Sequence, residues 1–291
     1  MSDVIIIGAG PAGISAAIYA ARGGADVTVI AKDSGALSKT EKIENYYGFA
    51  SPVAGKALFE AGIEQARSLG VEIVTDEVLS LDFDGGFTAK CVNGEYRAAY
   101  SVIATGVSRA APKIPGFKEL EGRRVSYCAV CDAFFFRGKS VAVLGNGEYA
   151  LEEANVLLKT AASVTVLTDG KEPQADFTDN IKIVTAPLSR ICGEDRVTGI
   201  ELEGGELLPL DGIFTAIGTA GATALARKLG AALSGNSIVI DANGETTVKG
   251  LFAAGDCTGG MLQIAKAVYE GARVGQYISR NLRNPKSGAS S

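Results

Sequence analysis

The chain has 291 residues, 47% of them hydrophobic, so it is long enough to bury one large core or two smaller ones. Its formal net charge of -5 argues against a general nucleic-acid binder but leaves room for local basic patches. Histidine is absent, which excludes Ser-His-Asp and Cys-His catalysis and removes the commonest metal ligand. No stretch approaches the ~20 apolar residues of a membrane helix, and no targeting segment precedes the first apolar run, so we expect a cytoplasmic protein.

The first pattern along the chain is a strand, a glycine-rich turn and an alanine-rich helix. The sequence VIIIGAGPAGISAAIYAARGG begins at Val4, and a second strand is expected over residues 26–30. Gly8, Gly10 and Gly13 satisfy G-x-G-x-x-G in this context, which favours a dinucleotide-binding unit over an ordinary tight turn. The three glycines respectively permit the turn, the approach of a pyrophosphate and the packing of helix on strand. The helix N-terminus offers N–H groups to phosphates.

Residues 128–132 read CAVCD, a pair of cysteines with two residues between them and an acid directly after. Such a pair can hold half a zinc site, form a structural disulfide, or cycle between dithiol and disulfide. Zinc would need two more soft ligands, and the other cysteines, at positions 91, 192 and 257, stand apart from one another. The residues therefore disfavour a metal site and leave both disulfide interpretations open.

A second copy of the nucleotide-binding pattern, VAVLGNGEYALEEANVLL, lies in the middle of the chain. Gly145, Gly147 and Ala150 give it the form G-x-G-x-x-A, and its next strand is expected over residues 163–167. Each copy continues with a hairpin-like segment, marked by Asn-Gly or Gly-Gly, and ends in a strand followed by glycine. The chain therefore predicts an α/β fold with two Rossmann-like nucleotide-binding domains in tandem.

The segment GLFAAGDC near the C-terminus breaks this symmetry, because the second copy already has its closing strand. It predicts a strand ending at Gly255-Asp256 and a helix from about Gln263 that return to the first domain. We therefore expect a discontinuous first domain, residues 1–113 and 241–291, with residues 114–240 inserted into it. The polar tail NPKSGASS is expected to fray.

Together these motifs resemble the low-molecular-weight flavoprotein thioredoxin reductases over nearly the whole chain. The matching pieces, in the family order, are GAGPAG, IENYYGF, ATG, SYCAVCDAFFFRGK, GNGEYALEEA and GLFAAGD. The resemblance implies FAD in the first domain, a redox-active disulfide at the start of the inserted domain, and a homodimer. The FAD contacts that it implies are Gly8, Gly10, Pro11, Ala12, Gly13, Asn45, Val78, Thr105, Gly106, Gly255, Asp256, Gln263 and Ile264.

The resemblance also implies roles for particular residues. Cys131 would be the sulfur next to flavin C4a, Cys128 the thiol that attacks thioredoxin, and Asp132 the acid or base that moves the proton. Asp256 would bind the ribityl chain, and the helix from Gln263 would direct its N-terminus at the pyrimidine edge of the flavin. In an intracellular flavoprotein a redox-active disulfide is favoured over a structural one.

Three places depart from the family pattern. The acid that ends the second strand of the FAD domain is Ala31 here, so we expect ribose binding to fall to Asp33 or to backbone groups. Tyr149 replaces a small residue, and its ring either fills the pyrophosphate space or turns outward. The histidine and two arginines that grip the 2′-phosphate of NADPH are replaced by Thr-Asp-Gly at residues 168–170. This loss disfavours NADPH without excluding NADH.

The losses, together with GGMLQIAKAVYEG near the C-terminus, look most like the clostridial ferredoxin-dependent flavin thioredoxin reductases. We therefore expect electrons to pass from reduced ferredoxin through FAD and the disulfide to thioredoxin. Alternatives are a reductase driven by NADH or NADPH, and a flavin-binding protein without turnover. A basic cluster beside the dithiol could attract an acidic partner, although such clusters are more often solvated surfaces. Its members are Arg109, Lys113, Lys118, Arg123, Arg124, Arg137 and Lys139.

Overall fold

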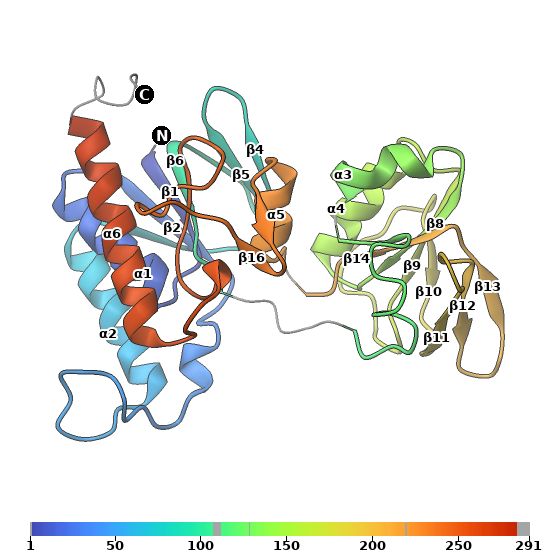
Figure 1. The fold of residues 1–291 in the computed structure, drawn as a ribbon, viewed down its shortest axis with the longest axis horizontal. Coiled ribbons are helices and arrows are strands. Elements are labelled where there is room, and N and C mark those ends of the chain that lie inside the picture. Colours follow the sequence, from blue (N-terminus) through green and yellow to red (C-terminus); the bar gives the residue numbers. More distant parts are fainter. Residues whose placement is uncertain (1, 107–111, 128, 219, 284–291) are drawn as a thin grey trace. The chain divides into compact units, whose positions relative to one another are not determined.

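The chain folds into two compact units, shown in Figure 1. The computed structural model describes residues 2–106, 112–127, 129–218 and 220–283, without the side chains of residues 130 and 131. The first unit comprises Met1–Val107 and Gly221–Ser291, and the second comprises Ser108–Ala220. Each unit contains a parallel sheet, so the predicted α/β fold with one Rossmann-like domain inserted into another is confirmed. The tail NPKSGASS lies outside the described residues.

The first unit is built on a seven-stranded sheet of order β3-β2-β1-β6-β5-β4, with β17 also pairing β6. The strands β1, β2, β3, β6 and β17 run parallel, and β5 pairs antiparallel with β6 and β4. Strands β2 and β17, the last four residues of β1 and the last three residues of β6 are mostly apolar and almost completely buried, as parallel strands covered on both faces are. The bounds are β1 Ser2–Ile7, β2 Val27–Ala31, β3 Glu72–Thr75, β4 Val78–Phe83, β5 Phe87–Cys91, β6 Glu95–Ile103 and β17 Leu251–Ala253.

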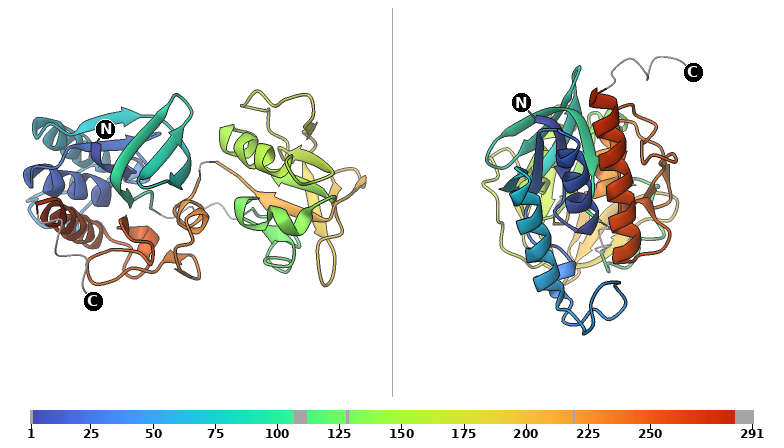
Figure 2. Two further views of the ribbon diagram at one scale, coloured as in Figure 1. Left: turned by 90° about the horizontal axis from the view of Figure 1, so that it is seen from above. Right: turned by 90° about the vertical axis from the view of Figure 1, so that its left-hand side faces the viewer.

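Three helices pack beside one another in this unit, with α1 (Pro11–Arg22) between α2 (Gly55–Ser68) and α6 (Ile264–Arg283), as Figures 1 and 2 show. Glycines allow the close approach of α1 and α6. A Cβ on Gly271 would clash with the carbonyl oxygen of Ala12, and a Cβ on Gly275 would clash with that of Ala16. The helix that follows the first glycine turn is therefore fixed against the C-terminal helix.

The second unit holds a five-stranded parallel sheet of order β10-β9-β8-β14-β7 and a three-stranded antiparallel sheet of order β11-β12-β13. The strands of the parallel sheet are β7 Val125–Ser126, β8 Ser140–Leu144, β9 Ser163–Leu167, β10 Lys182–Val184 and β14 Gly212–Thr215. The antiparallel strands are β11 Leu188–Cys192, β12 Gly199–Leu202 and β13 Leu207–Pro209. The helices are α3 Ala129–Asp132, the 3₁₀ turn Ala133–Phe136 and α4 Glu148–Leu157.

The chain returns to the first unit earlier than the sequence predicts. The expected boundary lies at residues 240 and 241, whereas the compact units divide between Ala220 and Gly221. The reason is α5 (Ala222–Lys228), whose buried apolar residues pack against β4, β6 and β16 (Ser237–Ile238). The small hairpin of β15 (Leu233–Ser234) and β16 also belongs to the first unit, because tertiary contacts of these short elements decide their place.

Candidate functional site

The first glycine-rich turn has the geometry that an anionic cofactor needs. Gly8 has a φ of +110°, and its N–H donates to the carbonyl oxygen of Ile30 at 2.8 Å. A Cβ on Gly8 would clash with the carbonyl oxygen of Ala104, and a Cβ on Gly13 would clash with that of Gly8. A Cβ on Gly10, by contrast, would meet no atom within 4 Å. Two glycines are thus required by neighbouring backbone, and the third borders open space.

The N-terminus of α1 is free to bind a phosphate. Gly10 is its N-cap residue and Pro11 its first helical residue, no side chain caps the helix, and its first turn contains no acid. The first N–H groups of a helix have no partner within the helix, and the helix dipole favours an anion beside them. These residues, with Ala12 in the same turn, therefore fit the pyrophosphate of a dinucleotide.

The ends of three parallel strands bring Thr105, Gly106, Gly255 and Asp256, four more of the predicted contacts, to the same edge of the sheet. Ala104 N–H donates to Ile7 at 2.8 Å, and Ala254 N–H donates to Ile103 at 3.1 Å. The segments that follow these residues, Thr105-Gly106 and Gly255-Asp256, therefore lie beside the glycine turn. A Cβ on Gly255, which has a φ of +89°, would come within 2.9 Å of the Cβ of Ala12. Asp256 opens a 3₁₀ turn, Asp256–Thr258, at this edge.

The segment around Asp256 is held by a largely buried ion pair that sequence reasoning missed. Lys266 donates to the carbonyl oxygens of Gly255 at 2.7 Å and Gly259 at 2.6 Å, and lies 3.2 Å from Glu270. The Glu270 carboxylate in turn accepts the N–H of Gly255 at 2.8 Å. The available signal is the spacing of four between a lysine and a glutamate on a helix. The pair fixes the backbone of the segment after β17.

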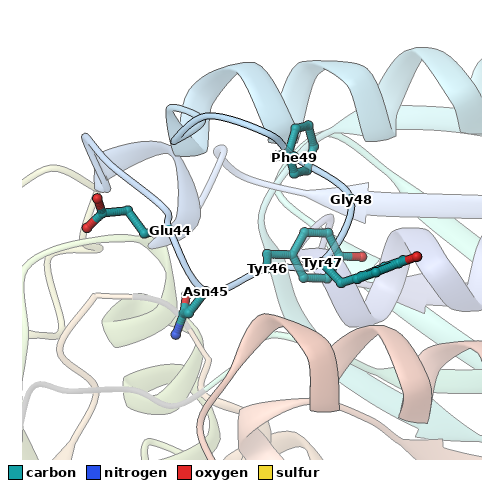
Figure 3. A pocket seen from close by; sticks show the side chains of 6 residues that line it. All are labelled: Glu44, Asn45, Tyr46, Tyr47, Gly48 and Phe49. Atoms are coloured by element: carbon teal, nitrogen blue, oxygen red, sulfur yellow. The ribbon is translucent and has the colours of Figure 1, made fainter.

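Asn45 and Gln263 are tied together although they are far apart in sequence. The side-chain amide of Asn45 donates to Gln263 at 2.9 Å, and Ile264 begins α6 directly after. Residues Glu44–Phe49 line a hollow in this loop, and Figure 3 shows Glu44 pointing away from the rings of Tyr46 and Tyr47. The structure therefore joins the IENYYGF segment to the start of the C-terminal helix. Val78, the remaining predicted contact in this unit, is buried at the start of β4.

The dithiol segment is fixed at both ends within the second unit. Cys128 and the side chain of Cys131 lie outside the described residues, whereas Ala129 and Asp132 lie within them. The N–H of Ala129 donates to the carboxylate of Glu153 at 2.6 Å, and Ser126 Oγ donates to the carboxylate of Asp132 at 2.6 Å. Asp132 thus has a defined position one residue after Cys131.

Glu153 is a residue that sequence reasoning missed. It lies on α4 and is 1% exposed, and it shares the buried face of the helix with Tyr149, Ala150, Ala154 and Leu157. An acid at a position whose helical neighbours are all apolar is the signal that could have found it, since an ionisable group is buried only when it has a partner. That partner is the backbone of the dithiol segment.

The second glycine-rich turn repeats the backbone of the first but not its chemistry. A Cβ on Gly145 would clash with the carbonyl oxygen of Ala216, and a Cβ on Gly147 would meet no atom within 4 Å. Glu148, however, stands in the first turn of α4, where its carboxylate opposes an incoming phosphate. Tyr149 is 3% exposed, so the interpretation that its ring turns outward is wrong. Its place on the inner face of α4 explains the burial.

The segment that follows β9 is folded onto this second turn, and its Thr168 and Asp169 side chains are hydrogen-bonded within the chain. Asn146 accepts the N–H of Gln174 at 2.6 Å through its carbonyl oxygen, and its side-chain amide donates to the carbonyl of Glu172 at 2.9 Å. Thr168 donates to the carbonyl of Lys171 at 2.5 Å. The carboxylate of Asp169 accepts the N–H of Leu188 at 2.9 Å. No arginine stands between residues 168 and 174.

Comparison with known proteins decides the family. The model of the pyridine nucleotide-disulphide oxidoreductase family matches residues 2–271. The thioredoxin reductase of Aquifex aeolicus is 38% identical over 274 residues, which cover 87% of this chain and 84% of the relative. This chain belongs to the pyridine nucleotide-disulphide oxidoreductases and, within them, to the thioredoxin reductases.

Two solved structures resemble this thioredoxin reductase at different levels. The atypical thioredoxin reductase TRi from Desulfovibrio vulgaris Hildenborough is 36% identical with a TM-score of 0.91, covering 99% of this chain and 100% of that one. A ferredoxin-flavin thioredoxin reductase from Clostridium acetobutylicum is 29% identical with a TM-score of 0.71, covering 97% of this chain and 98% of that one. The clostridial enzyme is therefore one of several neighbours, and the family assignment does not depend on it.

The family assignment makes the protein a flavoprotein disulfide oxidoreductase with FAD as its cofactor. The residues of the first unit fit this group, because the open space at Gly10 and the uncapped start of α1 accommodate a pyrophosphate. Within the described residues, no helix is long and apolar enough to cross a membrane. In the same part of the chain, no three His, Cys, Asp or Glu side chains gather as metal ligands.

Proposed function

We propose that this thioredoxin reductase takes electrons from reduced ferredoxin, and not from NADPH, and passes them through FAD and the Cys128–Cys131 disulfide to thioredoxin. The observation that supports the proposal is the state of the second glycine turn. The segment after β9, where relatives bind the 2′-phosphate, contains no arginine, and the side chains of Thr168 and Asp169 are hydrogen-bonded within the chain. Glu148 places a further negative charge in the first turn of α4, the helix that follows the second glycine turn.

The predicted contacts of the first unit are proposed to hold FAD there. When bound, FAD supplies the two electrons that return the disulfide to a dithiol. The backbone N–H groups at the start of α1 bind its pyrophosphate, and Asp256 accepts hydrogen bonds from its ribityl hydroxyls. Lys266 and Glu270 hold Asp256 in place by fixing the backbone on both sides of it.

The thiol chemistry is assigned to the CAVCD segment. The thiolate of Cys128 attacks the disulfide of thioredoxin and forms a mixed disulfide, and thioredoxin's leaving sulfur takes up a proton. The thiolate of Cys131 then attacks Cys128, thioredoxin's second sulfur leaves and takes up a proton from solvent, and the Cys128–Cys131 disulfide remains. Asp132, held by Ser126, accepts the proton that Cys131 gives up and returns it when the disulfide is next reduced.

A surface beside the dithiol suits a protein partner. Phe134 and Phe135 are 70% and 68% exposed, and the guanidinium of Arg137 lies 5.4 Å from the centre of the Phe134 ring. Exposed aromatic and basic side chains together are typical of interaction surfaces for acidic proteins. Arg124, another member of the basic cluster, instead pairs with Asp211 at 3.6 Å, and Arg109 lies outside the described residues.

We further propose that the protein is cytoplasmic and forms a homodimer.

Anaerobic mixing tests the donor. Oxidised enzyme is mixed separately with reduced ferredoxin, NADPH and NADH, and the flavin absorbance is followed. We expect bleaching by ferredoxin and none at a useful rate by NADPH. Each missing charge-assisted hydrogen bond to the 2′-phosphate is worth about 1.5–3 kcal/mol, so the loss of two arginines weakens binding by about a hundredfold or more. Rapid, complete bleaching by NADPH contradicts the proposal.

The NADH alternative rests on one observation, the open space at Gly147, which leaves room for a nucleotide without a 2′-phosphate. Rapid bleaching by NADH alone in the same experiment would favour it over ferredoxin.

The alternative of a flavin protein without turnover is tested by substitution of the two CAVCD cysteines. Cys131→Ser should stop electron passage between flavin and disulfide, and Cys128→Ser should stop only thioredoxin reduction. Near-normal thioredoxin reduction by both variants would support the non-catalytic alternative.

A further inference from the structure

The adenosine end of the cofactor site lacks the side chain that usually binds the ribose. In a Rossmann unit an acid at the end of the second strand hydrogen-bonds the ribose hydroxyls. Here β2 ends at Ala31. Asp33, the nearest acid in sequence, has one carboxylate oxygen bonded to the N–H of Gly35 at 2.7 Å and closes its own exposed turn.

Glu77 lies beside the end of β2, although it comes from the connection between β3 and β4. The N–H of Asp76 donates to the carbonyl of Ala31 at 3.1 Å, so the connection between β3 and β4 lies against the end of β2. The carboxylate of Glu77 is 2.5 Å from the ammonium of Lys32, the residue that follows Ala31. The same edge of the sheet carries the phosphate turn, because Gly8 bonds to Ile30 one residue before Ala31.

The backbone of Glu77 is held firmly. Its N–H donates to the carboxylate of Asp76 at 2.8 Å, and its carbonyl accepts the N–H of Val92 at 3.1 Å. Asp76 is itself buried and also accepts two hydrogen bonds from Asn93, one from the backbone N–H and one from the side chain. The carboxylate of Glu77 therefore projects from a fixed point of the fold.

The two oxygens of this carboxylate differ. Glu77 is 8% exposed, and its Oε2 bonds to Lys32, whereas its Oε1 is buried without a hydrogen-bond partner among the described residues. A buried carboxylate oxygen accepts hydrogen bonds only, and leaving it without a donor is unfavourable. A ribose hydroxyl is a donor of the right kind. Lys32, whose side chain is 52% exposed, pairs with the other oxygen, Oε2, and remains as the counter-charge when a ribose hydroxyl binds Oε1.

We propose that Glu77 binds the adenosine ribose of FAD, in place of the missing acid at the end of β2. Its Oε1 accepts a hydrogen bond from a ribose hydroxyl, while Lys32 keeps Oε2 paired. The backbone of Val78, the next residue and the first of β4, would then lie beside the adenine. This assignment depends on FAD being the cofactor and not on the identity of the electron donor.

The test compares FAD with its 2′,3′-dideoxyadenosine analogue, which lacks the ribose donors. Binding to the chain freed of flavin is measured by titration for the wild type, Glu77→Gln, Glu77→Asp and the control Asp33→Asn. We expect Glu77→Gln to weaken FAD by about tenfold or more, the size of a lost hydrogen bond to a charged group. Asp33→Asn should change FAD affinity by less than about twofold, because its carboxylate serves its own turn.

The analogue separates a ribose contact from a general loss of structure. The wild type and Asp33→Asn should prefer FAD to the analogue by about tenfold, whereas Glu77→Gln should bind the two with similar affinity. Glu77→Asp keeps the charge on a shorter side chain, so its preference for FAD over the analogue should lie between those of the wild type and Glu77→Gln. It replaces the glutamine variant in the test if Glu77→Gln does not fold. Equal binding of FAD and the analogue by the wild type overturns the proposal. So does an undiminished preference for FAD in the glutamine variant.

Discussion

The two glycine-rich turns of this chain share a backbone and differ in what surrounds it. In the first turn Gly8 bonds to Ile30 and would clash with Ala104, and in the second Gly145 bonds to Leu167 and would clash with Ala216. Gly10 and Gly147 both border open space. The two turns differ in the charges beside them and in the residues that cover them. The first helix begins without an acid, whereas Glu148 begins the second and the segment after β9 is folded onto the turn.

The comparison shows that a glycine pattern encodes a backbone conformation and not a ligand. Gly8, Gly13 and Gly145 are needed because neighbouring carbonyl oxygens leave no room for a Cβ, and this requirement remains when the nucleotide does not bind. Whether phosphate binds depends on the free N–H groups, the nearby charges and the residues that cover the turn. The two turns can therefore be separated experimentally.

The largest effect is expected at the third position of the two motifs. A Cβ on Gly13 would clash with the carbonyl of Gly8, so Gly13→Ala should push α1 off the turn, lower stability by about 1–3 kcal/mol and abolish stable FAD binding. Ala150, the equivalent residue of α4, already carries a Cβ, and Ala150→Gly should lower stability by only about 1 kcal/mol without loss of FAD. Flavin absorbance per protein and urea unfolding measure both. Full FAD content in Gly13→Ala would contradict the comparison.

An intermediate effect is expected at the second position, where both turns have space for a side chain. Gly10→Val should leave the fold intact and weaken FAD by at least about tenfold, because the methyl groups keep the pyrophosphate from the N–H groups of α1. Gly147→Val should leave FAD affinity and ferredoxin-driven thioredoxin reduction unchanged. FAD titration and steady-state rates check the pair. A loss of FAD affinity or of ferredoxin-driven activity in Gly147→Val would contradict the comparison.

The smallest effect at neutral pH concerns thiols that the first unit keeps buried. Burial raises the pKa of the Cys257 thiol from 9.0 to about 12. The unfolded chain therefore releases this proton at a lower pH than the folded chain, and stability is lost as pH rises from about 9 toward 12, by up to about 1.4 kcal/mol per pH unit. Cys257→Ala should reduce this slope in urea unfolding between pH 9 and 11.

The same burial gives a chemical readout at pH 8. In the native, dithiothreitol-reduced chain, iodoacetamide should modify the CAVCD cysteines and spare Cys257 and Cys91, whose pKa burial also raises to about 12. Mass spectrometry of the labelled chain distinguishes the positions. Labelling of Cys257 as fast as that of the CAVCD cysteines, or an unchanged alkaline slope in Cys257→Ala, would show that the first unit opens more readily than its packing indicates.

The sequence by itself determined the features that depend on short stretches of chain. The glycine motifs gave both βα turns, because only glycine fits where a carbonyl oxygen of a neighbouring strand lies against the Cα. The repeat and the late GLFAAGDC strand gave two Rossmann-like domains with one inserted into the other. The resemblance carried by the combined motifs gave the thioredoxin reductase family and FAD.

Only the tertiary structure decided the features that depend on which distant segments meet. It placed α5 in the first unit, buried Tyr149, and set Glu153 against the dithiol segment. It also brought Glu77 to the end of β2, although α2 and β3 lie between them in sequence. Local patterns specify backbone conformation and which face of an element is apolar. The partner of a buried charge is specified by strand order and packing, which bring together residues that no local pattern relates.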